Sequence, residues 1–124
     1  MNRILYIEDN DINRFVFQKM VDGYAEVDLA NDGYEGLDKL RGGCYDIVYL
    51  DLNLNDDNMD GFEVLRIMKE EKLKQNDMPK VIAMTAYVSQ DWQNKCREAG
   101  FDGFIGKPIN PDQVRESVKG QVSA

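Results

Sequence analysis

Apolar residues recur along this chain with two periods that alternate in a regular order. Short apolar runs predict β-strands, whereas apolar residues three and four positions apart predict amphipathic helices. The predicted strands are Ile4–Ile7, Ala25–Ala30, Tyr45–Leu50, Lys80–Met84 and Asp102–Gly106. The predicted helices run from Ile12 up to Gly23, Asp32 to Arg41, Gly61 to Lys74, Ser89 up to Gly100, and onward from Asn110-Pro111. The pattern therefore predicts strand–helix units in strict alternation, without repeats or linkers.

Each predicted helix has an apolar face that we expect to be buried. In the first helix this face consists of Ile12, Phe15, Val16 and Met20. The faces of the other helices are Tyr34, Leu37 and Leu40; Phe62, Val64, Leu65, Ile67 and Met68; Trp92, Cys96 and Ala99; and Val114 and Val118. Ser89 is a typical N-cap residue, and Asn110-Pro111 is a typical pair for the start of a helix.

The apolar content of the strands predicts their order in a sheet. The runs near residues 4–7, 47–50 and 80–84 are nearly continuous, as expected of central strands buried on both faces. The alternation at Ala25–Ala30 and the glycines of Asp102–Gly106 place those two strands at edges. Strict alternation implies parallel strands with right-handed crossovers. We therefore expect an α/β, flavodoxin-like doubly wound parallel sheet with the strand order 2-1-3-4-5.

Composition narrows the range of functions. The 124 residues, 43% of them hydrophobic, predict a single domain over residues 1–124 with no output domain. The net charge of −8 argues against binding to nucleic acid or to an anionic membrane. The absence of histidine excludes histidine-based catalysis and metal ligation. Cys44 and Cys96 predict free thiols, and the N-terminus has no long apolar run, so we expect a cytoplasmic domain.

Acidic residues lie at the ends of two predicted central strands. Glu8 and Asp9 follow the first strand, and Asp51 follows the third. The predicted switch point of the sheet lies between these strands, so the three carboxylates should meet at one crevice. Each pair would repel by roughly 4 kcal/mol at about 4 Å unless a proton or cation intervenes. A site whose ligands are all oxygen atoms favours Mg²⁺ over Ca²⁺. Any one of these three residues, taken by itself, would instead be interpreted as a solvated turn residue.

Two other kinds of site fit these residues less well. Asp51, Asn53 and Asn55 match the first ligand positions of an EF-hand loop, but Asp56 and Phe62 stand where that loop needs glycine and glutamate. A flavin phosphate would be repelled by the acidic segment EDNDIN that follows the first strand.

Thr85 ends the fourth predicted strand, and Lys107 ends the fifth. Each alone would be an ordinary cap or surface residue. Beside a metal-loaded aspartate they would supply a hydroxyl group and a cation. That set suits an aspartyl phosphate, for which a carboxylate oxygen is the nucleophile and cations neutralise the phosphoryl oxygens.

The residues at the strand ends resemble the motif of a known family. Glu8-Asp9, Asp51, Thr85-Ala86 and Lys107-Pro108, each after a different strand, are similar to the motif of CheY-like receiver domains of response regulators. The resemblance spans essentially the whole chain, and EDNDINR is similar to receivers of hybrid histidine kinases and stand-alone phosphorelay regulators. It implies a two-component or phosphorelay switch, a signalling domain rather than an enzyme. It also implies a phosphohistidine donor on a histidine kinase or histidine phosphotransfer protein, a downstream protein target, and a monomer or weak dimer.

The resemblance implies a role for each site residue. Asp51 would accept the phosphoryl group, Lys107 would pair with that group, and the Lys107–Pro108 bond would be cis. Thr85 would move its hydroxyl onto a phosphoryl oxygen, and Phe104 would be the switch aromatic that fills the space behind it. The implied ligands of Mg²⁺ are Asp9 and Asp51 directly, the backbone carbonyl of Asn53, and Glu8 through water.

Departures from the family pattern leave alternatives open. The loop after Asp51 is longer than usual and holds Asn55–Asn58 instead of a proline, so it could attract a second cation or simply be solvated. Tyr87 could overhang the phosphoryl group or cover the sheet edge. A pseudo-receiver that is never phosphorylated competes with the switch, but the intact motif argues against it. A phosphohydrolase would want an aspartate where Asn53 stands.

Overall fold

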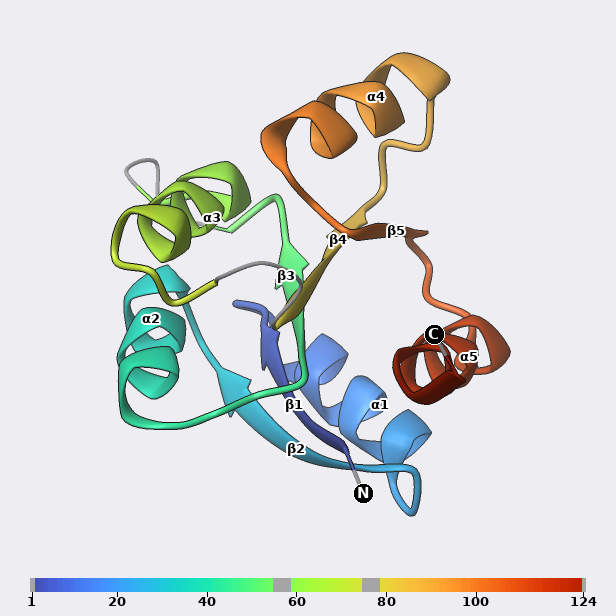
Figure 1. Ribbon diagram of the computed structural model, residues 1–124. Coiled ribbons are helices and arrows are strands. Elements are labelled where there is room, and N and C mark those ends of the chain that lie inside the picture. The colour runs from blue at the N-terminus through green and yellow to red at the C-terminus, as the bar shows by residue number, and fades with distance from the viewer. Residues whose placement is uncertain (1, 55–58, 75–78, 124) are drawn as a thin grey trace.

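The computed structural model describes residues 2–54, 59–74 and 79–123, and it contains all the predicted elements (Figure 1). The strands are β1 (Asn2–Ile7), β2 (Ala25–Ala30), β3 (Ile47–Asp51), β4 (Lys80–Thr85) and β5 (Gly103–Gly106). The helices are α1 (Asp11–Val21), α2 (Gly33–Gly42), α3 (Gly61–Glu70), α4 (Gln90–Ala99) and α5 (Pro111–Ser123). The predicted acidic loop Asn55–Asn58 lies outside the described residues.

The strands form one parallel sheet in the order β2-β1-β3-β4-β5, which confirms the predicted topology. In the register of this sheet Ile7 lies beside Leu50, and Thr85 lies beside Gly106. The residues that end β1, β3, β4 and β5 are therefore brought to the same edge, where the sequence analysis places the site. Figure 1 shows the sheet with α2, α3 and α4 on one side and α1 and α5 on the other.

The sheet is covered on both faces by apolar layers. Leu5 and Ile7 of β1 face the layer of α2, α3 and α4, whereas Ile4 and Tyr6 face the layer of α1 and α5. The apolar side chains of β1 and β3 that form the centre of both layers are fully buried. Burial on both faces explains why these strands read as continuous apolar runs, and it holds the strand ends in fixed positions.

The buried face of α1 differs from the predicted one. The predicted residues Ile12, Phe15 and Val16 are 72%, 60% and 39% exposed, and Met20 is only partly buried. Phe17 and Val21 contact the core instead. The prediction was wrong because α1 carries two overlapping apolar stripes, and a spacing of three and four residues fits both. The stripe that faces outward leaves an exposed apolar surface on α1.

The other helices follow the prediction more closely. In α2, Leu37 and Leu40 are buried, but Tyr34 is exposed because Gly33 and Gly36 make the close contact with the neighbouring side chains. The helix α3 ends at Glu70 instead of Lys74, and Lys72 just beyond it has the left-handed backbone that ends helices. In α5, Val114 and Val118 are buried as predicted.

The caps predicted for α4 and α5 are confirmed. The Ser89 hydroxyl accepts a hydrogen bond from the Trp92 N–H at 3.2 Å, and the Asn110 side chain accepts one from the Asp112 N–H at 2.8 Å. Gly100 closes α4 with a left-handed φ of 109°. Among the described residues, no helix combines the length and apolar character that crossing a bilayer requires.

Candidate functional site

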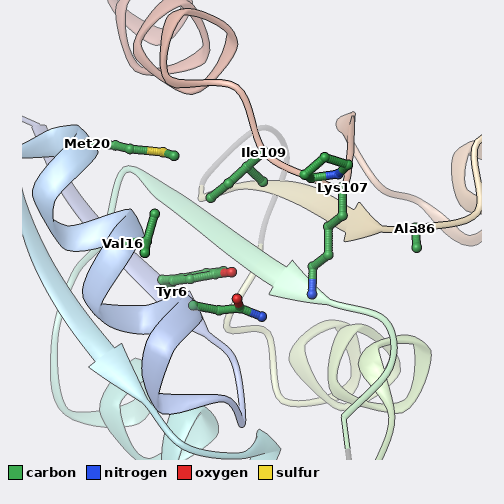
Figure 2. A pocket seen from close by; sticks show the side chains of 8 residues that line it. Tyr6, Val16, Met20, Ala86, Lys107 and Ile109 are labelled. Atoms are coloured by element: carbon green, nitrogen blue, oxygen red, sulfur yellow. The ribbon is translucent and has the colours of Figure 1, made fainter.

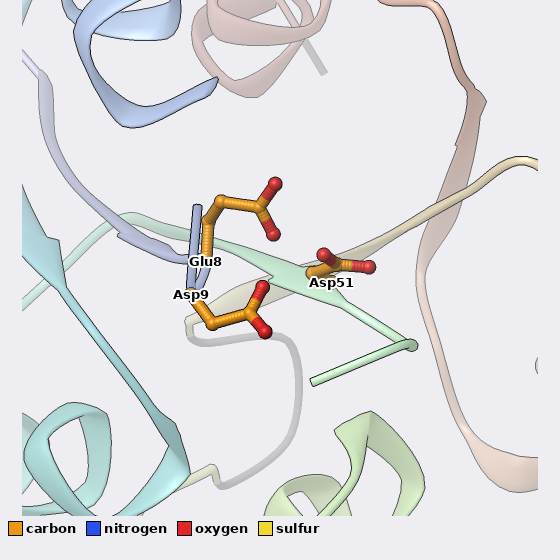
Figure 3. Close-up of side chains that lie close together, drawn as sticks. All are labelled: Glu8, Asp9 and Asp51. Atoms are coloured by element: carbon orange, nitrogen blue, oxygen red, sulfur yellow. The ribbon is translucent and has the colours of Figure 1, made fainter. Parts of the chain in front are cut away.

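The sheet brings the three predicted carboxylates together. Asp51 ends β3, and Glu8 and Asp9 come directly after β1, the neighbouring strand. One carboxylate oxygen from each lies within 4.8 Å of the others. Glu8 and Asp51 are buried, while Asp9 is partly exposed. Figure 3 shows the three side chains pointing toward a common space at the ends of the strands.

Lys107, which follows β5, extends across β4 to the same cluster. Its ammonium group lies 2.9 Å from an Asp51 oxygen and 3.3 Å from a Glu8 oxygen. The peptide bond between Lys107 and Pro108 is cis, as the resemblance implies. The lysine therefore neutralises part of the acidic charge while its own side chain is partly buried.

Burial and mutual contact separate the pKa values of the two buried acids. Burial, followed by a hydrogen bond with Asp51, raises the pKa of Glu8 to about 7. Burial opposes ionisation of Asp51 too, but hydrogen bonds with Glu8, the Asn53 N–H and Lys107 hold its pKa below the usual value. Burial also opposes the charge of Lys107, yet its bonds to Asp51 and Glu8 raise its pKa. These contacts favour the ionised form at Asp51 more than at Glu8, and an ionised carboxylate is the form that can act as a nucleophile.

Asparagine residues complete the pocket, and of these the sequence analysis assigned a role only to Asn53. The Asn53 N–H donates to an Asp51 oxygen at 3.0 Å. Asn13 of α1 donates from its side-chain amide to Glu8, a contact that sequence reasoning missed. Asn10 also lines the pocket and caps α1 by accepting from the Asn13 N–H at 2.9 Å. Their position in the sequence could have identified Asn10 and Asn13. The helix α1 begins four residues after β1 ends, so its first turn must lie beside the end of that strand.

The predicted switch residues Thr85 and Phe104 are not among the residues that line the acidic pocket. Thr85 is fully buried, and its hydroxyl accepts a hydrogen bond from the Tyr87 N–H at 3.1 Å. Phe104 is partly buried and lines a groove between α4 and β5. The Tyr87 ring packs on Trp92, with ring centres 5.6 Å apart. Tyr87 therefore packs on α4 in this structure, which is neither of the two alternatives for it, an overhang of the phosphoryl group or a cover for the sheet edge.

A glycine is required where the chain returns to the site. At Gly61, the first residue of α3, an added Cβ would lie 2.8 Å from the Asp51 carbonyl oxygen and 2.8 Å from the Leu52 Cα. Such distances to backbone atoms leave no room for a side chain. Gly61 thus allows α3 to start directly against the backbone that carries Asp51.

The residues present fit a hard divalent cation. The three acidic side chains all offer carboxylate oxygens, the donor type that Mg²⁺ prefers. The Glu8 Oε2 atom is buried and receives no hydrogen bond from the described residues. A buried carboxylate oxygen without a donor is costly, so a shared proton or a cation must serve it. Chemically, the pocket combines a carboxylate that its surroundings keep ionised, a set of oxygen atoms that could hold a cation, and a lysine.

Comparison with known proteins agrees with this geometry. Residues 4–119 match the response regulator receiver domain family. The chain is 38% identical over 96% of its length to the hybrid signal transduction histidine kinase L of Dictyostelium discoideum, of which it spans 7%. It is 29% identical over 94% of its length to the polar-differentiation response regulator DivK of Brucella anthropi, of which it spans 92%.

Solved structures agree as well. A CheY-like response regulator receiver domain protein from Methanospirillum hungatei is 28% identical, with a TM-score of 0.78 over 99% of this chain and 98% of the other. The first relatives are far longer than this chain, which spans only 5–9% of the first five. Receiver domains of two-component systems accept a phosphoryl group on an aspartate, and they pair with histidine kinases or phosphotransfer proteins. The chain belongs to the response regulator receiver domain family.

Proposed function

We propose that Asp51 is the phosphoacceptor and that the phosphoryl donor is a phosphohistidine on a histidine kinase or a histidine phosphotransfer protein. The observation that carries this proposal is the buried Asp51 carboxylate at the end of β3, 2.9 Å from the Lys107 ammonium group and next to Glu8 and Asp9. An Asp51 oxygen attacks the phosphorus, a P–O bond forms and the P–N bond breaks. The bonding electron pair returns to that imidazole nitrogen, and because the other ring nitrogen carries a proton, the ring leaves as neutral imidazole.

The residues around Asp51 hold the transferred charge. Lys107 pairs with the phosphoryl oxygens from the β5 side, and the Asn53 N–H fixes the carboxylate that attacks. Glu8, Asp9 and Asp51 would hold Mg²⁺, together with the Asn53 carbonyl, and Glu8 would act through water. Bound there, the ion would supply positive charge that neutralises phosphoryl oxygens.

Thr85 and Phe104 transmit the phosphorylation of Asp51 to the β4–α4 loop and the surface around it. In this structure the Thr85 hydroxyl accepts from the Tyr87 N–H. Phosphorylation gives that hydroxyl a charged acceptor, a stronger bond than a neutral one. Thr85 then turns toward the phosphoryl group, the β4–α4 loop follows, and Phe104 moves into the space behind Thr85. The output is a protein–protein contact with a downstream target, and the domain itself is a monomer or weak dimer in the cytoplasm rather than an enzyme.

The exposed surface of α1 supports a protein donor. Ile12, Phe15 and Val16, hereafter the α1 patch, are the exposed stripe of a helix that begins at the acidic pocket. Exposed apolar side chains gathered on one face mark protein contacts. A donor protein that lies on the α1 patch reaches the pocket with its phosphohistidine.

The decisive experiment is intact mass spectrometry with acetyl phosphate and Mg²⁺. The wild-type protein should gain one phosphoryl group. Asp51→Asn should abolish the gain, and chelation of Mg²⁺ with EDTA should suppress it. Asp91→Asn, at an exposed aspartate in the first turn of α4, is the matched control and should be labelled like the wild type. Labelling that persists in Asp51→Asn would refute the assignment.

A second readout tests the switch. Trp92 contacts Tyr87 of the β4–α4 loop and Phe62 of α3, so its fluorescence should change when the loop moves. The change should appear on phosphorylation and should be lost in Thr85→Ala, although this variant still accepts the phosphoryl group. An unchanged response in Thr85→Ala would remove Thr85 from the switch.

A further inference from the structure

The segment EDNDINR, from Glu8 to Arg14, contains two residues without a role in the proposed function. Asn13 and Arg14 are adjacent residues near the start of α1, and both are only partly exposed. Their side chains donate hydrogen bonds back to Glu8. Because Glu8 and Asp9 belong to the acidic pocket, these bonds connect α1 to the residues that would hold Mg²⁺.

Asn13 holds the side chain of Glu8. Its amide nitrogen donates to the Glu8 Oε1 atom, which the Lys107 ammonium group also approaches, at 3.3 Å. The lysine has a closer partner, since its distance to an Asp51 oxygen is 2.9 Å. Figure 2 shows the Lys107 side chain extending from the loop after β5 toward the end of β3, where Asp51 lies. Asn13, whose amide donates to no other described residue, is therefore the main restraint on the rotation of the Glu8 carboxylate.

Arg14 holds the main chain of Glu8. Its Nη1 atom donates to the Glu8 carbonyl oxygen at 2.6 Å, and the side chain is only 13% exposed. Its Nη2 atom pairs with Asp11 at the start of the same helix. The Glu8 N–H donates to the Ala30 carbonyl of β2 at 3.0 Å. Glu8 is thus held at its N–H, its carbonyl and its carboxylate, and α1 supplies a restraint on each of the last two.

The place of Asn13 in the fold does not otherwise require a polar residue. Asn13 lines both the acidic pocket and a neighbouring cavity of about 410 Å³ whose lining is mainly apolar. Val16 and Met20 of α1 lie on one side of this cavity and Ile109 on the other (Figure 2). A leucine has nearly the shape of asparagine, is the better helix former, and would continue the apolar lining. The amide is therefore explained by its bond to Glu8 and not by the packing of α1.

We propose that Asn13 and Arg14 are positioning residues for the Mg²⁺ site. They hold Glu8 in place, Asn13 at the carboxylate and Arg14 at the carbonyl, so that the pocket has its final shape before an ion binds. Hydrogen-bond partners that orient metal ligands raise the affinity for the metal, and a preformed site loses less conformational entropy on binding. The inference rests on the proposed function, because it concerns the ion that this function uses.

Isothermal titration calorimetry with Mg²⁺, without a phosphoryl donor, measures the effect directly. Asn13→Leu and Arg14→Met each remove one hydrogen bond to Glu8, so each should raise the dissociation constant by about threefold to tenfold. Arg14→Met also removes a positive charge, which by itself would favour the binding of a cation. Weaker binding of this variant therefore cannot come from the change in net charge.

The rate of labelling by acetyl phosphate gives a second readout. The Mg²⁺ concentration for the half-maximal rate should rise by the same factor in both variants, whereas the rate at saturating Mg²⁺ should stay at the wild-type value. Asn13→Leu should unfold in EDTA at no lower temperature than the wild type, because leucine favours the helix and fits the cavity. A role in folding alone would not produce this combination.

Gln18→Leu is the matched control, since it replaces an exposed amide of the same helix, and it should bind Mg²⁺ like the wild type. Wild-type affinity in Asn13→Leu would overturn the role of Asn13, and wild-type or tighter binding in Arg14→Met would overturn that of Arg14. A lower rate at saturating Mg²⁺ with an unchanged half-maximal concentration would overturn the proposal for either residue, because the effect would then lie on the reaction itself.

The wild-type protein distinguishes this inference from the proposed function. If it is not labelled at Asp51 by acetyl phosphate, the proposed function fails whatever the variants do. If it binds Mg²⁺ and is labelled, and both variants behave like it, only the positioning roles of Asn13 and Arg14 fail.

Discussion

Tyr6 and Tyr49 are paired residues of neighbouring strands, and both are fully buried. They differ in what their hydroxyl groups contact, since Tyr49 has Ser117 and Tyr6 has no partner among the described residues. Tyr49→Phe should therefore lower the free energy of unfolding by about 1 kcal/mol. Tyr6→Phe should leave it unchanged or raise it. Urea denaturation measures both, and an equal loss in the two variants would show that Tyr6 has a partner in solution.

Gly61 offers a second test at the scale of one residue. Gly61→Ala should destabilise the protein by about 1–3 kcal/mol, because its Cβ would press on the backbone of Asp51 and Leu52. It should also slow phosphorylation by acetyl phosphate, since the displaced backbone carries the nucleophile. Gly42→Ala is the control: nothing lies within 4 Å of its Cβ, and it ends α2. The interpretation fails if both variants unfold at the same urea concentration.

The site residues that sequence reasoning found share one property. Glu8, Asp51, Thr85 and Lys107 end or follow strands, and topology alone decides where strand ends meet. The unpartnered hydroxyl group of Tyr6 could not be predicted, because no sequence pattern records the lack of a hydrogen bond among the described residues. The hydroxyl direction of Thr85 could not be predicted either, because its bond to the Tyr87 N–H depends on the course of the loop.

At the scale of the elements, periodicity predicted every strand and helix but did not predict which face of α1 is buried. The outward stripe of Ile12, Phe15 and Val16 is as apolar as the inward one of Phe17 and Val21. The sequence pattern shows that α1 has two apolar stripes, but packing against the sheet determines which stripe is buried. The error is informative, since the exposed stripe is the surface to which we assign the donor.

Asp28 of β2 forms hydrogen bonds to Arg3 of β1 and to Tyr45, which lies just before β3. This carboxylate gives a prediction about how stability depends on pH. Asp28 accepts from Tyr45 at 2.6 Å and from Arg3 at 3.1 Å. The bond from Tyr45 and, next to it, the bonds and charge of Arg3 hold the pKa of Asp28 below its usual value. A lowered pKa in the folded state means that Asp28 stabilises the fold above about pH 4 and loses this effect as the pH falls further.

Asp28→Asn should therefore destabilise the protein at pH 7, and the difference from the wild type should shrink as the pH falls below about 4. Urea denaturation at a series of pH values measures this difference. Glu26→Gln, at an exposed carboxylate of the same strand, is the control and should show little difference at either end. A difference that stays constant with pH would indicate that Asp28 acts through packing instead of charge.

At the scale of the whole molecule, the contacts of Lys107 limit how strongly phosphorylation biases the switch. Hydrogen bonds to charged groups contribute roughly 1.5–3 kcal/mol each, and a shift from 1:99 to 99:1 requires about 5.5 kcal/mol. Lys107 already pairs with Asp51 and Glu8 before any phosphoryl group arrives. The free energy that Lys107 contributes on phosphorylation is therefore only the difference between its new ion pair with the phosphoryl group and its present ion pairs with Asp51 and Glu8. Under the proposed function we therefore expect Thr85, whose present partner is a neutral N–H, to supply most of the bias.

The same acidic cluster should make the stability of the whole domain depend on Mg²⁺. An ion that binds only the folded state raises the free energy of unfolding by about 2.7 kcal/mol at a hundredfold excess over its dissociation constant. For a domain of 124 residues this corresponds to roughly 10 °C in the midpoint of thermal unfolding. We expect that rise in the wild type, measured by calorimetry with and without EDTA.

Variants of the ligands distinguish a specific site from general screening of the −8 net charge. Asp9→Asn should abolish most of the Mg²⁺ effect, because Asp9 supplies one of the three carboxylates that converge within 4.8 Å. Asp91→Asn changes the net charge equally but lies on α4, so it should keep the effect in full. Sodium chloride at the same ionic strength should not replace Mg²⁺. Equal responses of the two variants would mean that the ion acts on overall charge, and the strand-end cluster would then lose its assignment as a metal site.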